Sequence, residues 1–139
     1  MKKIFLFAIT IALMVSSCKK TDCPVPTPTP DPQRIAGNWL GKYSTSDATA
    51  PSNNQYWEIK AGGEIIVHDG FTTATAPDAN KGIGTWVLNG NTFRCTYRFL
   101  TIDVNRSVQC TLTNDNKLVG FRGNNGAVTG NGQVEMTKQ

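Results

Sequence analysis

The fold of this chain is decided by the stretch Ile83–Leu100, which reads IGTWVLNGNTFRCTYRFL. Apolar or aromatic residues alternate with polar ones on both sides of Asn89-Gly90, and this period of two is typical of β-strands with one buried face. Asn-Gly supplies the two positive φ angles of a type I′ turn. The stretch therefore predicts a β-hairpin with strands at Ile83–Leu88 and Thr92–Leu100.

Similar alternating segments, bounded by Gly, Asn and Asp, fill residues 33–139, and no convincing helical period appears. Gly62-Gly63 and Asn114-Asp115-Asn116 indicate further hairpin turns. A sheet with one apolar face and no helix to cover it must close on itself. We therefore expect one all-β domain, an eight-stranded antiparallel up-and-down barrel. Its other six strands are predicted at Ile35–Tyr43, Gln55–Lys60, Glu64–His68, Arg106–Thr113, Lys117–Arg122 and Gln133–Lys138.

The chain begins with a lipoprotein-like leader. Lys2 and Lys3 precede the twelve-residue run Ile4–Val15, apolar except for Thr10, which suits a secretory signal and is too short to span a bilayer. Val15-Ser16-Ser17-Cys18 resembles the lipobox of bacterial lipoproteins. That resemblance implies removal of a signal peptide of residues 1–17 and attachment of diacylglycerol to the Cys18 thiol, followed by acylation with a fatty acid such as palmitate. The alternative is an ordinary thiol at the end of a leader.

Residues 18–32 form a proline-rich linker. Every second residue from Pro24 to Pro32 is proline, which favours polyproline II and a semi-rigid spacer. A proline-rich docking site is the alternative interpretation. Lys19 stands where an Asp would, by resemblance to sorting rules for lipoproteins, hold the protein at the inner membrane. We therefore expect a lipid anchor in the outer membrane, with the face left open.

Aromatic side chains dominate the predicted interior. If Gly62-Gly63 is the turn, Trp57 faces His68, which places this histidine on the interior face as well. We therefore take as candidate ligand-binding residues the inward aromatic residues and this histidine: Trp39, Trp57, His68, Trp86, Phe93, Tyr97 and Phe99. The competing interpretation is that the same side chains fill the barrel, because eight strands enclose little more than their own side chains.

Cys95 and Cys110 fall on the interior faces of neighbouring strands. A hairpin centred between Ile102 and Asp103 would place them opposite each other, within reach of a disulfide. A turn nearer Val104 would offset them by two residues and leave two buried thiols. An oxidising envelope favours the bridge, but the sequence leaves both possibilities open.

Three segments of the domain resemble the lipocalin-like lipoprotein domains of Bacteroidetes. They are Gly37-Asn38-Trp39, Gly84-Thr85-Trp86-Val87-Leu88-Asn89-Gly90-Asn91 and Gly132-Gln133-Val134-Glu135-Met136-Thr137-Lys138. The resemblance implies a calycin-type barrel, related in shape to lipocalins and avidins, with a small apolar molecule in its mouth. Lipocalins usually pack an Arg from the last strand over the first Trp. This last strand has no Arg, and Arg122 or Arg34 are the candidates to replace it.

Other classes of function find little support in the sequence. His68 is the only histidine, so every Ser-His-Asp or Cys-His arrangement must use it, and we predict no catalytic residue. Without a Cys-x-x-Cys pair or a second imidazole, we predict no metal site and no cofactor. Residues 33–139 carry ten basic and eight acidic side chains, a near balance that argues against a nucleic-acid partner.

We therefore expect a membrane-anchored, lipocalin-like module that binds a small apolar or amphipathic molecule and is not an enzyme. The main alternative is a side-chain-filled barrel that acts in protein interaction or envelope assembly, with an unspecified protein partner. Inhibition of an envelope-attacking enzyme such as lysozyme ranks third. Such inhibitors resemble acidic barrels with a Ser-Gly loop motif, which this mildly basic domain lacks.

Overall fold

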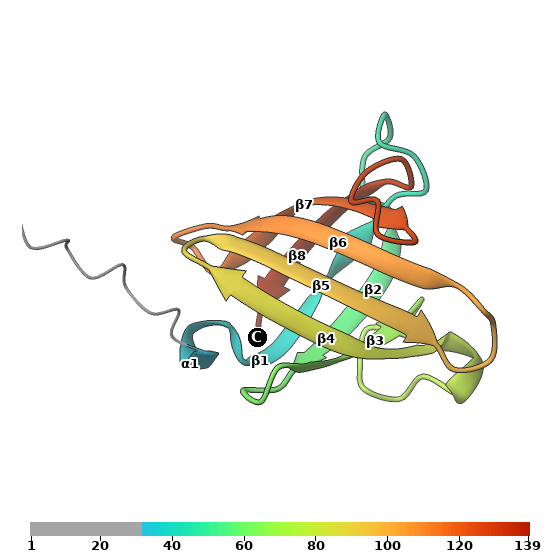
Figure 1. Cartoon of the computed structure of the whole chain (residues 1–139), viewed down its shortest axis with the longest axis horizontal. Coiled ribbons are helices and arrows are strands. Elements are labelled where there is room, and N and C mark those ends of the chain that lie inside the picture. Colours follow the sequence, from blue (N-terminus) through green and yellow to red (C-terminus); the bar gives the residue numbers. More distant parts are fainter. Residues whose placement is uncertain (1–31) are drawn as a thin grey trace, which may run out of the picture.

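The computed structural model describes residues 32–139 of the 139-residue chain. The predicted signal peptide, Cys18 and nearly all of the linker lie outside the described residues. A short helix precedes eight antiparallel strands that pair in sequence order, with β8 returning to β1 to close the barrel (Figure 1). The predicted fold class is confirmed. The elements are α1 (Pro32–Ile35), β1 (Gly37–Tyr43), β2 (Asn53–Ile59), β3 (Glu64–Asp69), the 3-10 turn η1 (Asp78–Asn80), β4 (Lys81–Asn89), β5 (Thr92–Phe99), β6 (Asn105–Leu112), β7 (Lys117–Asn124) and β8 (Gln133–Lys138).

The two ends of the barrel differ. We call one the α1 end, since α1, the last residue of β8 and the short turns at 60–63, 90–91 and 113–116 lie there. The other is the loop end, formed by loops 44–52, 70–80, 100–104 and 125–132. Residues near the start of β1 therefore lie at the α1 end, and residues near its finish lie at the loop end.

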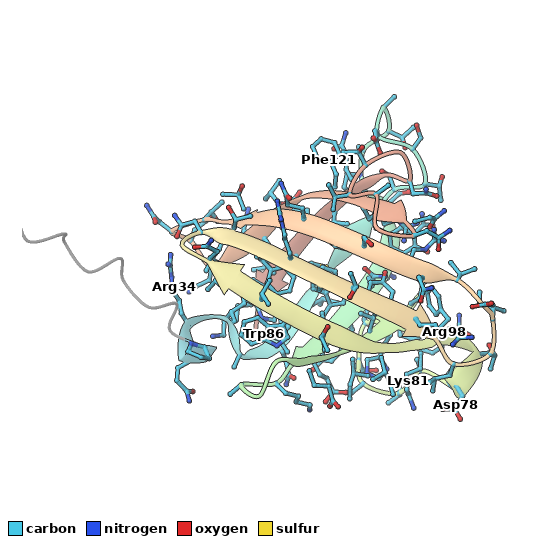
Figure 2. The ribbon with its side chains drawn as sticks, viewed as in Figure 1. Arg34, Asp78, Lys81, Trp86, Arg98 and Phe121 are labelled. Atoms are coloured by element: carbon cyan, nitrogen blue, oxygen red, sulfur yellow. The ribbon has the colours of Figure 1, made fainter. Side chains whose placement is uncertain are left out.

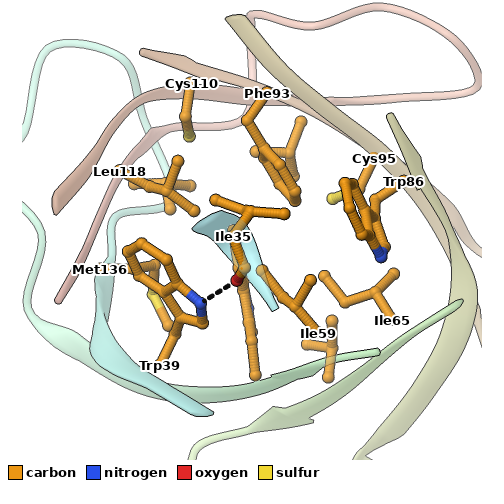
Figure 3. Packing of buried hydrophobic residues seen from close by; sticks show 14 of the residues in the cluster. Ile35, Trp39, Ile59, Ile65, Trp86, Phe93, Cys95, Cys110, Leu118 and Met136 are labelled. Atoms are coloured by element: carbon orange, nitrogen blue, oxygen red, sulfur yellow. Dashed lines mark hydrogen bonds between the residues drawn. The ribbon is translucent and has the colours of Figure 1, made fainter. Parts of the chain in front are cut away.

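Helix α1 covers the interior at its own end. Ile35 is fully buried, and its carbonyl accepts a hydrogen bond of 2.9 Å from Trp39 Nε1 (Figure 3). The sequence predicted Ile35 inside the first strand, but the strand begins only at Gly37, whose φ of 133° suits glycine. Lys138 Nζ donates to the Arg34 carbonyl at 3.1 Å, so a lysine of the last strand contacts this region.

The two arginines considered as replacements for the lipocalin arginine lie elsewhere. The Arg122 guanidinium stacks on Tyr43, the last residue of β1 and thus far along that strand from Trp39. Arg34 Nη1 donates to Asn91 Oδ1 in the turn between β4 and β5.

The lumen near the α1 end is filled by its own side chains. Phe93 stacks on both Trp57 and Trp86, with ring centroids 6.0 and 6.1 Å apart. Ile59, Ile65, Leu118, Met136 and other apolar residues surround these rings, and every member of the cluster is at most 8% exposed (Figure 3). Tight apolar packing of this kind leaves the floor of the barrel closed to a ligand.

Glycines at inward positions let the strands approach closely. A Cβ on Gly84 would lie 1.8 Å from the Thr96 carbonyl oxygen of β5, and one on Gly41 would lie 2.0 Å from the Glu135 oxygen of β8. Any larger residue would therefore collide with the neighbouring backbone. These glycines allow the sharp bends that a small closed barrel requires.

The predicted register of the β2–β3 hairpin is wrong by one residue. Trp57 pairs with Val67, and His68 pairs with Tyr56. A shift of one residue moves every side chain of a strand to the opposite face. His68 therefore lies on the outer face of the barrel, not on the interior face that the predicted turn implied.

Candidate functional site

Polar side chains gather inside the barrel at the loop end. They occupy inward positions near the loop-end termini of six strands, and we call them the polar cluster: Tyr43, Gln55, Asp69, Tyr97, Arg106 and Arg122. Gln55 pairs directly with Asp69 across β2 and β3, and Tyr97 with Arg106 across β5 and β6. The Tyr43 and Tyr97 phenols each lie close enough to Asp69 and Arg122 to interact with them electrostatically.

Neighbouring groups hold the cluster in place. The Arg122 guanidinium carbon lies 3.7 Å from the ring centroid of Tyr43, and Arg122 Nε donates to the Asn131 carbonyl at 3.0 Å. Arg106 Nη1 donates to the side chain of Asn124 and, at 3.4 Å, to Asn131 Oδ1. Both guanidinium groups are thus oriented by other residues, and each is only partly used.

Five members of the cluster bury a polar atom that has no hydrogen-bond partner. The atoms are Gln55 Nε2, Asp69 Oδ1, Tyr97 Oη, Arg106 Nε and Arg122 Nη1. Among the side chains of residues 32–139, the only other atom of this kind is His68 Nδ1. Each unsatisfied buried polar group costs about 1–3 kcal/mol. Because these atoms are concentrated at one end of the lumen, a polar group bound there would satisfy the most hydrogen bonds and gain the most binding free energy.

The phenols of the cluster stay protonated well above neutral pH. Burial, together with hydrogen bonding and repulsion from Asp69, raises the pKa of Tyr43 to about 12 against the opposing effect of Arg122. Burial also raises the pKa of Tyr97 far above its usual value, although Arg122 and Gln55 act in the opposite direction. Gln55 approaches the Tyr97 phenol without reaching hydrogen-bond geometry. Tyr97 Oη is therefore available as a donor.

Two loops are joined beside the cluster. The Asp47 carboxylate accepts hydrogen bonds of 2.7 Å from the Gly130 and Gly132 amides, and Gln133 Nε2 donates to the Asp47 carbonyl at 2.7 Å. Loop 44–52 and loop 125–132 consequently lie against each other at the loop end (Figure 1). Asn131, which contacts both arginines of the cluster, belongs to the second of these loops.

The predicted aromatic wall divides into two groups. The packed floor contains three of the predicted residues with indole rings and one with a phenyl ring: Trp39, Trp57, Trp86 and Phe93. The indole N–H groups of Trp39, Trp57 and Trp86 donate to the Ile35 carbonyl, Gln55 Oε1 and the Lys60 carbonyl, respectively. Tyr97 belongs to the polar cluster, and Phe99 contacts the Tyr97 ring edge-on at a centroid distance of 5.7 Å. Tyr97 and Phe99 therefore lie beside the unpaired polar atoms, and Trp57 joins the floor to the cluster through its hydrogen bond of 2.9 Å to Gln55 Oε1.

Sequence reasoning missed most of the polar cluster. Gln55 shares its face with Trp57, and Arg122 shares its face with Leu118, so both continue the inward alternation. The available signal was a polar residue at an inward position near a strand end. The prediction of the interior considered mainly aromatic residues and therefore did not include these polar ones.

His68 forms a separate contact on the outer face of β2 and β3. It is 2% exposed, its Nε2 lies 2.9 Å from Glu58 Oε1, and its ring meets Tyr56 edge-on at 5.9 Å. Burial would raise the pKa of Glu58, but hydrogen bonds from Lys60 and His68 outweigh burial and hold that pKa below its usual value. The register thus separates His68 from the other candidate ligand-binding residues.

Cys95 and Cys110 are free, buried thiols. Cys95 pairs with Val108, and Cys110 pairs with Phe93, so the two cysteines are offset by two residues and are not directly opposite. Both face the interior, as predicted. Burial raises the pKa of Cys110 to about 12 and, with a contribution from Cys110, that of Cys95 well above its usual value.

Residues 32–139 include no group of three or more His, Cys, Asp or Glu side chains that could hold a metal ion. Within the same range, α1 is the only α-helix, and no helix has the length and apolar content needed to cross a membrane. Comparison of the chain with known proteins found no matching family model, no matching curated protein and no matching solved structure.

Proposed function

We propose that this domain is a lipocalin-like binding module that holds a compact amphipathic molecule in the loop end of its barrel. We also propose that it is tethered to the outer membrane through lipidated Cys18. The observation that carries the first proposal is the set of five buried polar atoms without partners, gathered at one end of the lumen. A barrel that served only as packed scaffold would gain stability by replacing them with apolar atoms.

The division of the lumen limits the size of the ligand. An eight-stranded barrel can be filled by side chains or can hold one small molecule. Here the α1 end is filled by the stacked rings of Trp57, Trp86 and Phe93, which leaves only the loop end. Phe99 and Tyr43 offer apolar surface there, next to the polar groups. A compact molecule with one polar and one apolar part suits this arrangement better than a long hydrocarbon chain.

A second candidate function is protein interaction through the outer face of β4 and β5. Ile83 and Val87 are 41% and 62% exposed on this face, next to Arg98 and Arg94, respectively. From Gly82 to Ile102 these two arginines are the only charged residues, and Figure 2 shows Arg98 there. Two surface hollows adjoin Thr96, which lies between the two arginines in sequence. One, of about 230 Å³, is lined by Arg98, and the other, of about 320 Å³, by Arg94. Arg98 forms an ion pair of 3.1 Å with Asp103, and Arg94 Nε donates to Gln109 Oε1 at 2.8 Å. Arginine beside exposed apolar residues is typical of protein interfaces. An inhibitor of an envelope-attacking enzyme would belong to this class.

Mapping the binding of a simple amphipathic probe tests these functions. Hexanoate and hexanol are titrated separately into the ¹⁵N-labelled full-length protein, held in lipid nanodiscs, and amide shifts are followed by NMR. Ligand binding predicts saturable shifts at Gln55, Tyr97 and Arg122 with at least one probe. Shifts confined to the outer face around Val87 would favour the second candidate. No saturable shift anywhere with either probe would contradict the proposal of ligand binding.

A further inference from the structure

The hydrogen-bonding capacity of the polar cluster specifies the head group of its ligand. We infer, on the basis of the proposed function, that the bound molecule carries a single carboxylate held by Arg106, Arg122, Tyr97 and Gln55. Three features of the cluster support a single carboxylate: the balance of donors and acceptors, the balance of charge, and the orientation of the two guanidinium groups.

Donors outnumber acceptors among the unpaired atoms. Gln55 Nε2, Arg106 Nε and Arg122 Nη1 can only donate, and the protonated Tyr97 phenol can donate as well. Asp69 Oδ1 is the single unpaired atom that can only accept. An ionised carboxylate accepts through two oxygens with about four lone-pair positions and donates nothing. Its capacity matches four donors, whereas an alcohol or an amide would leave several of them unsatisfied.

The charge of the cluster favours an anion with one negative charge. Arg106 and Arg122 form no ion pair of 4.0 Å or less among the described residues, and Asp69 is the only acid in the cluster. Two guanidinium groups and one carboxylate leave an excess of one positive charge in a buried site, where an uncompensated charge is costly. One carboxylate neutralises this excess. A dianion would add repulsion from Asp69.

The guanidinium groups are oriented before a ligand arrives. Stacking on Tyr43 and the hydrogen bond to Asn131 fix Arg122, while Asn124 and Asn131 hold the Nη1 atom of Arg106. These contacts leave Nη1 of Arg122 and Nε of Arg106 unused. Groups that are already immobilised lose little conformational freedom on binding, which favours affinity.

The test compares probes of equal length that differ in head group. Hexanoate, hexanol and hexylamine are titrated into the full-length protein in lipid nanodiscs, with empty nanodiscs as the blank, and binding is measured by calorimetry and NMR. We expect hexanoate to bind at least tenfold more tightly than hexanol, and hexylamine to bind most weakly. Succinate, with two carboxylates, and inorganic phosphate are expected to compete poorly with hexanoate.

Variants locate the effect. Arg122→Leu should lower hexanoate affinity at least tenfold and change hexanol affinity less than twofold. The matched control is Arg94→Leu, which removes a guanidinium from the outer face of β5 and should leave both affinities unchanged. Tyr97→Phe removes only a hydroxyl from the cluster and preserves the ring packing. This variant provides the test if Arg122→Leu fails to fold. It should weaken hexanoate binding severalfold.

The outcomes separate the two proposals. Equal affinity for hexanoate and hexanol at the cluster would overturn the carboxylate assignment and leave ligand binding intact. Succinate or phosphate binding as tightly as hexanoate would overturn the preference for a single carboxylate. Failure of all the hexyl probes to bind would overturn the proposed function together with this inference. Equal losses in Arg122→Leu and Arg94→Leu would place the anion outside the barrel.

Discussion

Gly84 shows how little room the barrel leaves between neighbouring strands. Because an added Cβ would lie 1.8 Å from the Thr96 carbonyl oxygen, Gly84→Ala must push β4 away from β5. We expect a loss of about 1–3 kcal/mol or more in the free energy of unfolding, measured by urea denaturation. Gly62→Ala is the control, since nothing lies within 4 Å of its added Cβ. Equal stability of the two variants would contradict the close approach of the strands.

Tyr43 predicts how stability changes in alkali. Its pKa is about 12 in the folded chain against a usual value of 10.0, so its contribution to stability is complete below about pH 10 and is lost as the pH rises towards 12. The free energy of unfolding should therefore fall over this window. In Tyr43→Phe the fall should be shallower, measured by urea denaturation at several pH values between 9 and 12. Identical slopes in the two proteins would rule out this role for Tyr43.

The two buried thiols make a prediction about reactivity. Cys95 and Cys110 are free, inaccessible and hard to ionise, and thiolates are the reactive form. In the native protein at pH 8 neither should react with a maleimide within an hour, while both should react in 6 M guanidinium chloride. Peptide mapping by mass spectrometry distinguishes them from Cys18 and Cys23. A peptide pair linked through Cys95 and Cys110 would contradict the structure.

At the scale of elements, α1 is expected to stabilise the barrel far beyond its length of four residues. Ile35 is fully buried among the rings of the floor, so Ile35→Ala should cost about 2–4 kcal/mol in the free energy of unfolding. Ile102→Ala serves as control because Ile102 is 52% exposed in the loop after β5, and it should change stability by less than about 0.5 kcal/mol. Similar losses in both variants would show that α1 does not seal the floor.

The two hairpins explain which parts of the fold could be predicted. The β4–β5 turn lies one residue later than predicted: its two residues are Gly90 and Asn91, Asn89 pairs with Thr92, and of the predicted pair only Gly90 has a positive φ, 58°. Leu88 therefore pairs with Phe93, a shift of two residues that leaves every side chain on its predicted face. Before β3, Gly62 and Gly63 permit several turns. The chain closes with Lys60 N donating to the Glu64 carbonyl, which lengthens the turn by one residue and places His68 outside. Alternation alone could not decide this register, because Ile65 and Ile66 are both apolar.

The polar cluster was harder to predict for a different reason. Gln55, Tyr97 and Arg122 come from strands β2, β5 and β7, none of which is the sheet neighbour of another, and closure of the barrel brings them together. In a single strand, Gln55 and Arg122 each look like a solvated residue near a loop. Their shared burial is a property of the closed sheet and could not be deduced from any one segment.

For the whole molecule, the lipid anchor is the prediction to test. If Cys18 carries the lipid, Cys18→Ser should move the protein from the membrane fraction to the soluble fraction or leave an unprocessed precursor. Metabolic labelling with a palmitate analogue, followed by fractionation and immunoblotting, measures both effects. Cys23→Ser keeps the lipobox intact and should remain labelled and membrane-bound. If Cys23→Ser lost the label and Cys18→Ser kept it, the lipid would be on Cys23 and the proposed anchor at Cys18 would be wrong.

The position of α1 has a consequence for traffic to and from the site. Both Pro32, where the domain begins, and Lys138, at the end of β8, lie at the pole opposite the polar cluster. If Cys18 carries the proposed lipid, the chain from the bilayer reaches the domain at the pole opposite the polar cluster. Under both proposals the ligand would then arrive from the aqueous phase, and the protein would collect dissolved acids and not acids held in the bilayer.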